Sequence, residues 1–208
     1  MGGSLAVVFD FGGVLITPVT EKLSLLAQRH HSSVPVLLEL FLGPIDSGDH
    51  PWHRAERGEI AVADIQGLLA PWAAEVGITL DGDEIDILVT PNYQIATQMT
   101  SRVAELQREG IATALLTNTF AEFRPILERD IDLSTFDHVI ESYAVKSRKP
   151  ELAIYLATAN ALGVDHANII YLDDFHQNLV PAAALGWRTI HVVGHDQAVA
   201  ELNALLAS

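Results

Sequence analysis

The stretch LAVVFDFGGVL, from Leu5 to Leu15, decides the fold. It opens with an apolar run, Leu5 to Phe9, that is rich in β-branched and aromatic side chains. Asp10 and the pair Gly12-Gly13 follow this run. An apolar run that ends in turn residues is typical of a buried strand that leads into a tight turn. The sequence therefore predicts a short core strand with a carboxylate at its C-terminal end.

The same pattern recurs along the chain and alternates with helical patterns. Further strands are expected at Ile111 to Leu116, Val139-Ile140, Asn168 to Leu172 and Arg188 to Val193. Helices are expected at Ile95 to Glu109, Glu122 to Arg129, Glu151 to Leu162 and Gln177 to Leu185. Strands that alternate with helices predict an α/β fold, with a parallel sheet covered by helices on both faces.

Residues 17–92 break this alternation, because they contain no clear buried strand. Helical patterns at Glu21 to His30, Val34 to Leu42 and Val62 to Val76 are separated by Pro, Gly and Asp residues. We therefore expect a helical cap domain over residues 17–92. It would be inserted into an α/β core domain formed by residues 1–16 and 93–208.

Composition and charge exclude several classes of protein. The chain has 208 residues, of which 49% are hydrophobic, so it can bury a substantial core and is neither disordered nor a coiled coil. It has no cysteine, which excludes disulfides, thiolate zinc sites and cysteine nucleophiles. Twelve basic against 27 acidic residues give a net charge of −15, which opposes binding to nucleic acids and anionic membranes.

From the sequence of the N-terminal region we expect no targeting signal. The apolar stretch from Ser4 to Ile16 has Asp10 in its middle and lacks the basic flank of a signal peptide. It is also shorter than the roughly 20 residues that span a bilayer. We therefore expect a cytoplasmic protein whose partners are neither nucleic acids nor membranes.

Polar residues follow the predicted strands at the points where ligands bind in parallel sheets. Asp10 follows the first strand, Thr117-Asn118 the second and Asp173-Asp174 the fourth, while Lys149 precedes the helix before the fourth strand. Carboxylates brought together at one sheet edge repel one another unless a divalent cation and a lysine offset their charge. The pattern predicts a cation-dependent site for a small anion.

These residues lie in four motifs: FDFGGVL at Phe9 to Leu15, LLTNT at Leu115 to Thr119, SRKP at Ser147 to Pro150 and YLDDFHQN at Tyr171 to Asn178. In order and spacing they resemble the motifs of the haloacid dehalogenase-like (HAD) hydrolase superfamily, and the inserted helices resemble its helical cap of the first type. The resemblance implies a Rossmann-like sheet of strand order 3-2-1-4-5.

The resemblance also implies roles for single residues. Asp10 is similar to the nucleophilic aspartate that takes the transferred group as an acyl phosphate. Lys149 matches the lysine that neutralises the nucleophile and the phosphate. Thr117 and Asn118 match the motif whose hydroxyl and backbone N–H bind phosphoryl oxygens.

A metal site follows from the same resemblance. Asp174 matches the metal-binding acid, and Asp10 is expected to share the metal. Asp173 and Asn178 would complete the inner or outer shell, and the backbone carbonyl of Gly12 would supply another ligand. Magnesium suits such an oxygen-only site. The implied function is a Mg²⁺-dependent phosphatase of a small phosphorylated metabolite.

Gly12 departs from the phosphatase pattern, which has a second aspartate two residues after the nucleophile. That aspartate protonates the leaving oxygen and then activates water, and glycine can do neither. General acid–base catalysis contributes typically 10² to 10⁴ in rate. The D-x-G pattern and the stretch ERGEI, Glu56 to Ile60, resemble sugar-phosphate phosphatases and members similar to the N-terminal domain of epoxide hydrolases.

Three interpretations of Gly12 follow. A phosphatase could take its acid from the cap or act on an anomeric sugar phosphate or acyl phosphate, whose leaving group needs little protonation. Candidate acids are His50, His53 and Glu56, and candidate substrate clamps are Arg54 and Arg57. A 2-haloacid dehalogenase needs no such acid, but it also needs no metal. A domain that binds phosphate or a protein without turnover is the third.

Overall fold

The computed structural model describes residues 4–44 and 48–207 and contains a five-stranded parallel sheet. The strands are β1 (Ala6–Phe9), β2 (Ala112–Thr117), β3 (His138–Glu141), β4 (Ile169–Asp173) and β5 (Arg188–His191). Their order is β3-β2-β1-β4-β5, with β1 between β2 and β4. The order 3-2-1-4-5 expected from the resemblance is thereby confirmed.

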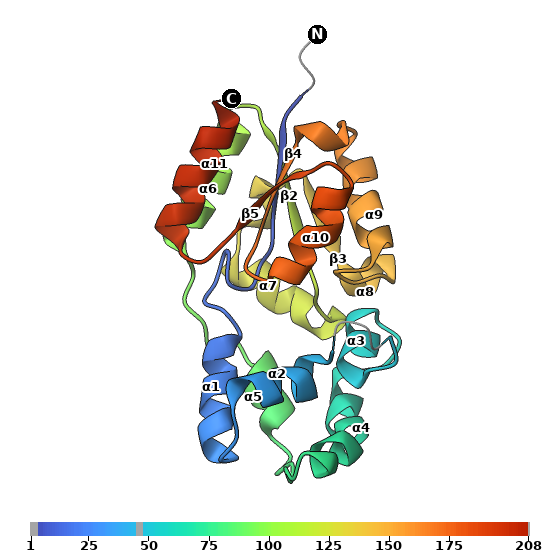
Figure 1. Cartoon of the computed structure of the whole chain (residues 1–208). Coiled ribbons are helices and arrows are strands. Elements are labelled where there is room, and N and C mark those ends of the chain that lie inside the picture. The colour runs from blue at the N-terminus through green and yellow to red at the C-terminus, as the bar shows by residue number, and fades with distance from the viewer. Residues whose placement is uncertain (1–3, 45–47, 208) are drawn as a thin grey trace.

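Helices cover both faces of the sheet (Figure 1). Helices α6 (Thr97–Arg108) and α11 (His195–Leu206) pack on one face, and α9 (Leu152–Leu162) and α10 (His176–Ala184) pack on the other. The short helices α7 (Arg124–Asp130) and α8 (Ser142–Val145) flank β3, and three-residue 3₁₀ turns lie at Ala121–Phe123, Leu133–Thr135 and His166–Asn168. Each face of the sheet has its own hydrophobic cluster, and alternate residues of β1 point to the two faces. Val7 and Phe9 belong to the first cluster, with α6 and α11, and Val8 belongs to the second, with α9 and α10.

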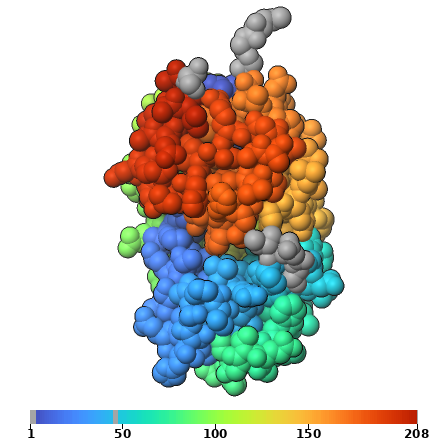
Figure 2. Space-filling view, in the orientation of Figure 1, coloured from blue at the N-terminus to red at the C-terminus, as the bar shows by residue number. Residues whose placement is uncertain are grey.

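Five helices between β1 and α6 form a third hydrophobic cluster, to which Phe120 of the core also contributes. They are α1 (Thr20–Arg29), α2 (Val34–Leu42), α3 (Pro51–Glu56), α4 (Val62–Glu75) and α5 (Glu84–Val89). Leu23, Leu37, Phe41 and Leu69 are fully buried among them. In Figures 1 and 2 these helices, coloured blue to green, lie against one end of the α/β core.

The chain leaves the core and returns to it at one place. The backbone N–H of Thr17 donates to the carbonyl of Gln94 at 3.0 Å, and Ile16 pairs with Ile95 in an antiparallel bridge. These contacts tie the two connecting segments together beside the end of β1. We propose residues 17–92 as the extent of the cap domain.

The described part of the chain holds no helix that combines the length and apolar character needed to cross a membrane.

Two leucines on α1 test whether the cap depends on its own core. Leu23 is fully buried, whereas Leu25 is 60% exposed. Leu23→Ala is expected to lower the free energy of unfolding by about 2–5 kcal/mol, because it leaves a cavity in the cluster. Leu25→Ala, the matched control on the same helix, is expected to change it by less than about 0.5 kcal/mol. Urea unfolding monitored by circular dichroism measures both, and equal effects would contradict this packing.

Candidate active site

The carboxyl ends of β1 and β4 place three aspartates at one edge of the sheet. Phe9 pairs with Leu172, and the backbone N–H of Asp10 donates to the carbonyl of Leu172 at 2.9 Å. Asp10 therefore lies beside Asp173 and Asp174, and one oxygen from each lies within 4.8 Å of the others. The parallel register brings together the carboxylates that are far apart in the sequence.

Lys149 is the cation of this cluster. Its Nζ lies 2.7 Å from Asp10 Oδ1 and 2.8 Å from Asp173 Oδ2, and its side chain is only 1% exposed. Burial acts to lower the pKa of Lys149, but Asp10 and Asp173 raise it above its ordinary value. The lysine therefore stays protonated and offsets part of the charge of the three carboxylates.

Asn118 holds the loop that carries Lys149. Its side-chain Nδ2 donates to the carbonyl of Lys149 at 3.0 Å, and its Oδ1 accepts from the backbone N–H of Lys149 at 2.8 Å. Thr117, the residue before Asn118, ends β2. It is buried and lines a cavity that lies between the core and the cap. The side-chain amide of Asn118 thus positions Lys149, a role that the sequence pattern did not reveal.

The two oxygens of Asp10 have different surroundings. Oδ1 accepts from Lys149 Nζ and from the backbone N–H of Phe11, both at 2.7 Å. Among the described residues, none donates a hydrogen bond to Oδ2. Burial raises the pKa of Asp10 well above its ordinary value, and Lys149 opposes this shift. Oδ1 is thus fixed by two donors, while Oδ2 is available to a ligand.

Asp173 is the anchor of the cluster and is completely buried. Its oxygens accept hydrogen bonds from Lys149 Nζ, the Tyr171 hydroxyl, the backbone N–H of Phe175 and Asn178 Nδ2. Burial and the charge of Asp173 raise the pKa of Tyr171 well above its ordinary value, so Tyr171 remains a donor. Tyr171 lies two residues before Asp173 on the same face of β4, and this spacing is the signal that could have identified it.

Asp174 is the carboxylate that most needs a further partner. Its Oδ1 is buried, and no described residue hydrogen-bonds it. Burial, and then the charge of Asp173, raise the pKa of Asp174 to about 7. A buried, unpaired oxygen beside two more carboxylates fits a divalent cation, which prefers a set of oxygen ligands.

The glycine pair of the first motif allows Asp174 to approach. Gly13 has φ +67°, and a Cβ there would lie 2.1 Å from Asp174 Oδ2, so a side chain at position 13 would displace the carboxylate. Gly12 differs, because a Cβ there would meet nothing within 4 Å. The open space at Gly12 faces the cavity and contains no acid.

A cavity of about 210 Å³ lies between the core and the cap, above these residues. Asp10, Thr117, Asn118, Lys149 and Asp174 line its core end. Apolar side chains line most of the remainder: Phe11, Val19, Leu38, Leu42, Trp52, Leu88, Val89, Tyr93, Phe120, Phe123 and Phe175. Polar and charged side chains, among them Lys22, Glu56 and Arg148, line the rest, so the wall beyond the charged core end is mostly but not wholly apolar.

Of the three candidate acids in the cap, two line the cavity and one does not. His50 caps α3 by accepting from the backbone N–H of Trp52, its Nε2 contacts the carbonyl of Leu40 at 3.1 Å, and it does not line the cavity. Burial, and then His53, lower the pKa of His50 to about 4. His53 and Glu56 do line the cavity, and His53 Nε2 lies 2.6 Å from the carbonyl of Leu42.

Neither arginine chosen from the cap sequence reaches this cavity. Arg57 pairs with Glu59 at 2.5 Å and with Glu151 at 3.0 Å, and Arg54 lies 3.6 Å from Glu59. The expected substrate clamp at Arg57 is instead a contact between α3 and the loop at Glu151. Arg148, from the SRKP motif, is the arginine that lines the cavity, and it was not singled out from the sequence.

The chain is similar to known proteins in sequence and in fold. A family model described as haloacid dehalogenase-like hydrolase matches residues 5–186. Solved structures with the same fold include a HAD family enzyme of Bacteroides thetaiotaomicron in complex with magnesium and inorganic phosphate (23% identity, TM-score 0.63, 90% of this chain and 93% of that one). They also include the L-2-haloacid dehalogenase of Xanthobacter autotrophicus (20% identity, TM-score 0.63, 97% and 83%).

Several relatives match almost the whole chain, among them one from mouse and one from a fungus. Mouse acyl-CoA dehydrogenase family member 10 is 32% identical over 205 residues, which are 97% of this chain and 19% of the mouse protein. The sesquiterpene phosphatase astK of Aspergillus oryzae is 28% identical over 207 residues, 97% of this chain and 96% of the fungal protein. With the matching family model, the strand order and the four motifs around one site, this chain belongs to the haloacid dehalogenase-like hydrolase family.

Proposed function

We propose that this protein is a Mg²⁺-dependent phosphatase that hydrolyses a small phosphate monoester through an aspartyl phosphate on Asp10. One observation carries the proposal. Asp10 has one oxygen fixed by Lys149 and Phe11, and its other oxygen, Oδ2, receives no hydrogen bond from any described residue at the charged end of the cavity. A carboxylate held in this way is suited to nucleophilic attack.

Magnesium fits the donor set beside this nucleophile. Asp10 and Asp174 would hold the ion with the carbonyl of Gly12, while Asp173, whose oxygens already accept several hydrogen bonds, and Asn178 would support them. The unpaired Oδ1 of Asp174 is the observation that supports a cation here. When bound, the ion would neutralise charge on the carboxylates and on the phosphoryl oxygens.

The residues of the chain account for the two chemical steps. Asp10 attacks phosphorus, and the bond between phosphorus and the ester oxygen breaks with its electron pair on the leaving oxygen. Water then hydrolyses the acyl phosphate and restores the carboxylate, and the proton released in this step balances the proton that the leaving oxygen takes up from solvent to form the alcohol. Lys149 stays protonated, and Thr117 is close enough to the cavity to bind phosphoryl oxygens.

The apolar wall supports a substrate whose organic part is apolar. Leu38, Leu42, Phe120 and Phe175 offer few polar partners for the hydroxyls of a sugar, which would lose hydrogen bonds to water on binding. The relative astK is named a sesquiterpene phosphatase and matches this chain over nearly its full length. We therefore propose a phosphate ester of a small apolar alcohol as the substrate class.

The same assays distinguish the phosphatase from two alternative functions. Release of halide from a 2-haloacid, insensitive to chelator, would indicate a dehalogenase, although the unpaired Asp174 oxygen favours a metal enzyme. A domain that binds phosphate without turnover would retain the pocket but release no product.

The nucleophile is tested by Asp10→Asn. With hexyl phosphate and Mg²⁺, phosphate release is expected from the unaltered protein and is expected to fall by at least about 10⁴-fold in Asp10→Asn, because an amide is a poor nucleophile. Excess chelator is expected to stop release, and added Mg²⁺ to restore it. Undiminished release by Asp10→Asn would exclude Asp10 as the nucleophile.

The two glycines test the metal site. Gly13→Ala is expected to weaken Mg²⁺ binding about 10-fold or more, because its Cβ would collide with Asp174. Gly12→Ala, which keeps the backbone carbonyl and meets open space, serves as the matched control and is expected to bind Mg²⁺ like the unaltered protein. Isothermal titration calorimetry measures both, and a metal site elsewhere would leave both affinities unchanged.

The apolar wall is tested with unbranched alkyl phosphates. From ethyl to hexyl phosphate, kcat/KM is expected to rise up to about fourfold per methylene, the value of about 0.8 kcal/mol for each buried CH₂. Leu38→Asn is expected to reduce this gain while leaving ethyl phosphate, the control substrate, nearly unaffected. Preference for glucose 6-phosphate over hexyl phosphate would contradict the proposed substrate class.

A further inference from the structure

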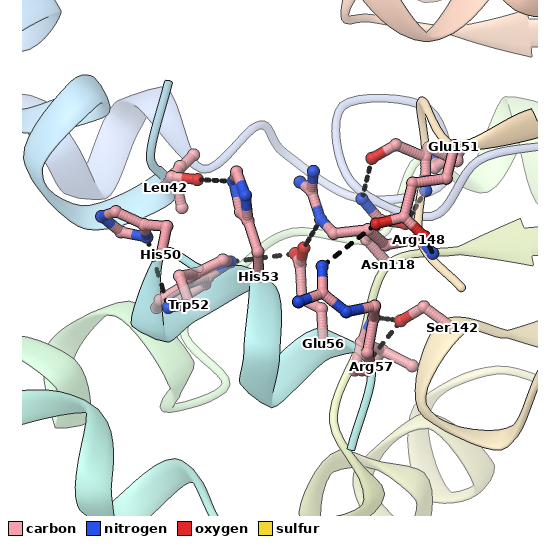
Figure 3. Close-up of polar contacts among 12 residues, drawn as sticks. Leu42, His50, Trp52, His53, Glu56, Arg57, Asn118, Ser142, Arg148 and Glu151 are labelled. Atoms are coloured by element: carbon pink, nitrogen blue, oxygen red, sulfur yellow. Dashed lines mark hydrogen bonds and ion pairs between the residues drawn. The ribbon is translucent and has the colours of Figure 1, made fainter. Parts of the chain in front are cut away.

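Arg148 is a largely buried cation that lines the cavity and has no role in the reaction proposed above. It precedes Lys149 in the chain, but the two side chains extend to different partners. Lys149 reaches Asp10 and Asp173, whereas Arg148 Nε reaches Glu56 Oε2 of the cap at 2.5 Å. The side chain of Arg148 is only 11% exposed. Figure 3 shows Arg148 beside Glu56, with a dashed line that marks the contact between the two side chains.

Glu56 holds the Arg148 guanidinium in a defined orientation. Its Oε1 accepts from Trp52 Nε1 at 2.9 Å, and its Oε2 accepts from Arg148, so both oxygens are engaged. The Glu56 side chain is 8% exposed and lies within the α3 segment that lines the cavity. A carboxylate that accepts hydrogen bonds with both oxygens is arranged as an anchor for Arg148 and not as a proton donor.

The remaining donors of Arg148 are available to a ligand. Glu56 engages only Nε, and no acceptor in the described part of the chain hydrogen-bonds the two terminal amino groups. Arg148 lines the same cavity as Asp10 and Gly12. A guanidinium is always protonated and presents its N–H groups in a fixed plane, so it can bind an oxygen on which negative charge develops.

Arg148 lies on the side of the cavity that the leaving oxygen of the substrate would face. In phosphoryl transfer the attacking and leaving oxygens lie roughly in line with phosphorus. With Asp10 at the core end of the cavity, the leaving oxygen faces the cap, where Glu56 holds Arg148. Gly12 supplies no acid to this oxygen, and the space beside it is open.

Building on the phosphatase proposed above, we infer that Arg148 is a catalytic residue that stabilises the leaving oxygen, with Glu56 as its positioning residue. Arg148 donates hydrogen bonds to the ester oxygen as the phosphorus–oxygen bond breaks and the electron pair moves to that oxygen. A water molecule supplies the proton, so Arg148 keeps its charge. The hydroxide that remains is consumed when the aspartyl phosphate is hydrolysed. In sum, one phosphate ester and one water molecule give one alcohol and one inorganic phosphate.

The test compares two esters that differ in their need for this help. The leaving group of hexyl phosphate is a strongly basic alkoxide, whereas 4-nitrophenyl phosphate releases a stable phenolate. Arg148→Ala is expected to lower kcat for hexyl phosphate about 10²-fold, the usual effect of removing one donor to a developing oxyanion, and to change 4-nitrophenyl phosphate less than about threefold. Arg54→Ala, on α3 but outside the cavity, is the matched control and is expected to affect neither ester.

Each outcome has a distinct meaning. Equal losses on both esters would overturn the inference and indicate that Arg148 binds the phosphoryl group or supports the fold. No loss on either ester would also overturn it. If the unaltered protein hydrolyses neither ester, the proposed phosphatase function fails, and this inference fails with it.

Two further variants separate catalysis from folding. Glu56→Gln is expected to reproduce part of the loss on hexyl phosphate and to spare 4-nitrophenyl phosphate, since it loosens Arg148 without removing it. In the double variant Arg148→Ala with Gly12→Asp, the new carboxyl group fits the open space and is expected to recover turnover of hexyl phosphate at least about 10-fold as a general acid. An absence of recovery in a variant whose Tm is unchanged would count against a role at the leaving oxygen.

Discussion

The buried ammonium group of Lys149 between Asp10 and Asp173 is the interaction on which the rest of the site depends. Removing a charged group from water costs several kcal/mol, and this cost is offset only if partners are held in good geometry. Three separate parts of the fold supply that geometry: Asp10 directly follows β1, Asp173 ends β4, and Asn118 after β2 fixes the backbone of Lys149. The strand order, which makes β1 the neighbour of both β2 and β4, is therefore also what assembles the site.

The sheet and the cluster of aspartates could be predicted from the sequence because both follow from short-range patterns. An apolar run such as Leu5 to Phe9 is buried on both faces in a parallel sheet, and a polar residue after it must lie at the carboxyl edge. The structure places Asp10, Lys149, Asp173 and Asp174 together at that edge.

The cap contacts could not be predicted in the same way. Helix α3 has only six residues and is capped by His50, which is not among the usual capping residues, so no pattern marked it as a helix. The position of α3 determines which side chains face the cavity. The sequence predicts Arg57 as a substrate clamp, but in the structure Arg57 pairs with Glu59 and Glu151. The role of Arg148 depends on Glu56, 92 residues away in the sequence, and only the folded chain brings the two together.

Gly12 has a physical consequence beyond the loss of an acid. Asp10 and Asp174 already have raised pKa values because they are buried, with Asp173 adding to the effect on each. A fourth carboxylate at position 12 would add to this repulsion, whereas glycine adds no charge and leaves the space above the nucleophile open. The Arg148–Glu56 pair adds no net charge to the cavity, yet it presents N–H donors on the cap side of that space. Such an arrangement stabilises a negatively charged leaving oxygen with a guanidinium that does not titrate. Stabilisation of the leaving group would therefore not depend on the protonation state of a carboxylic acid.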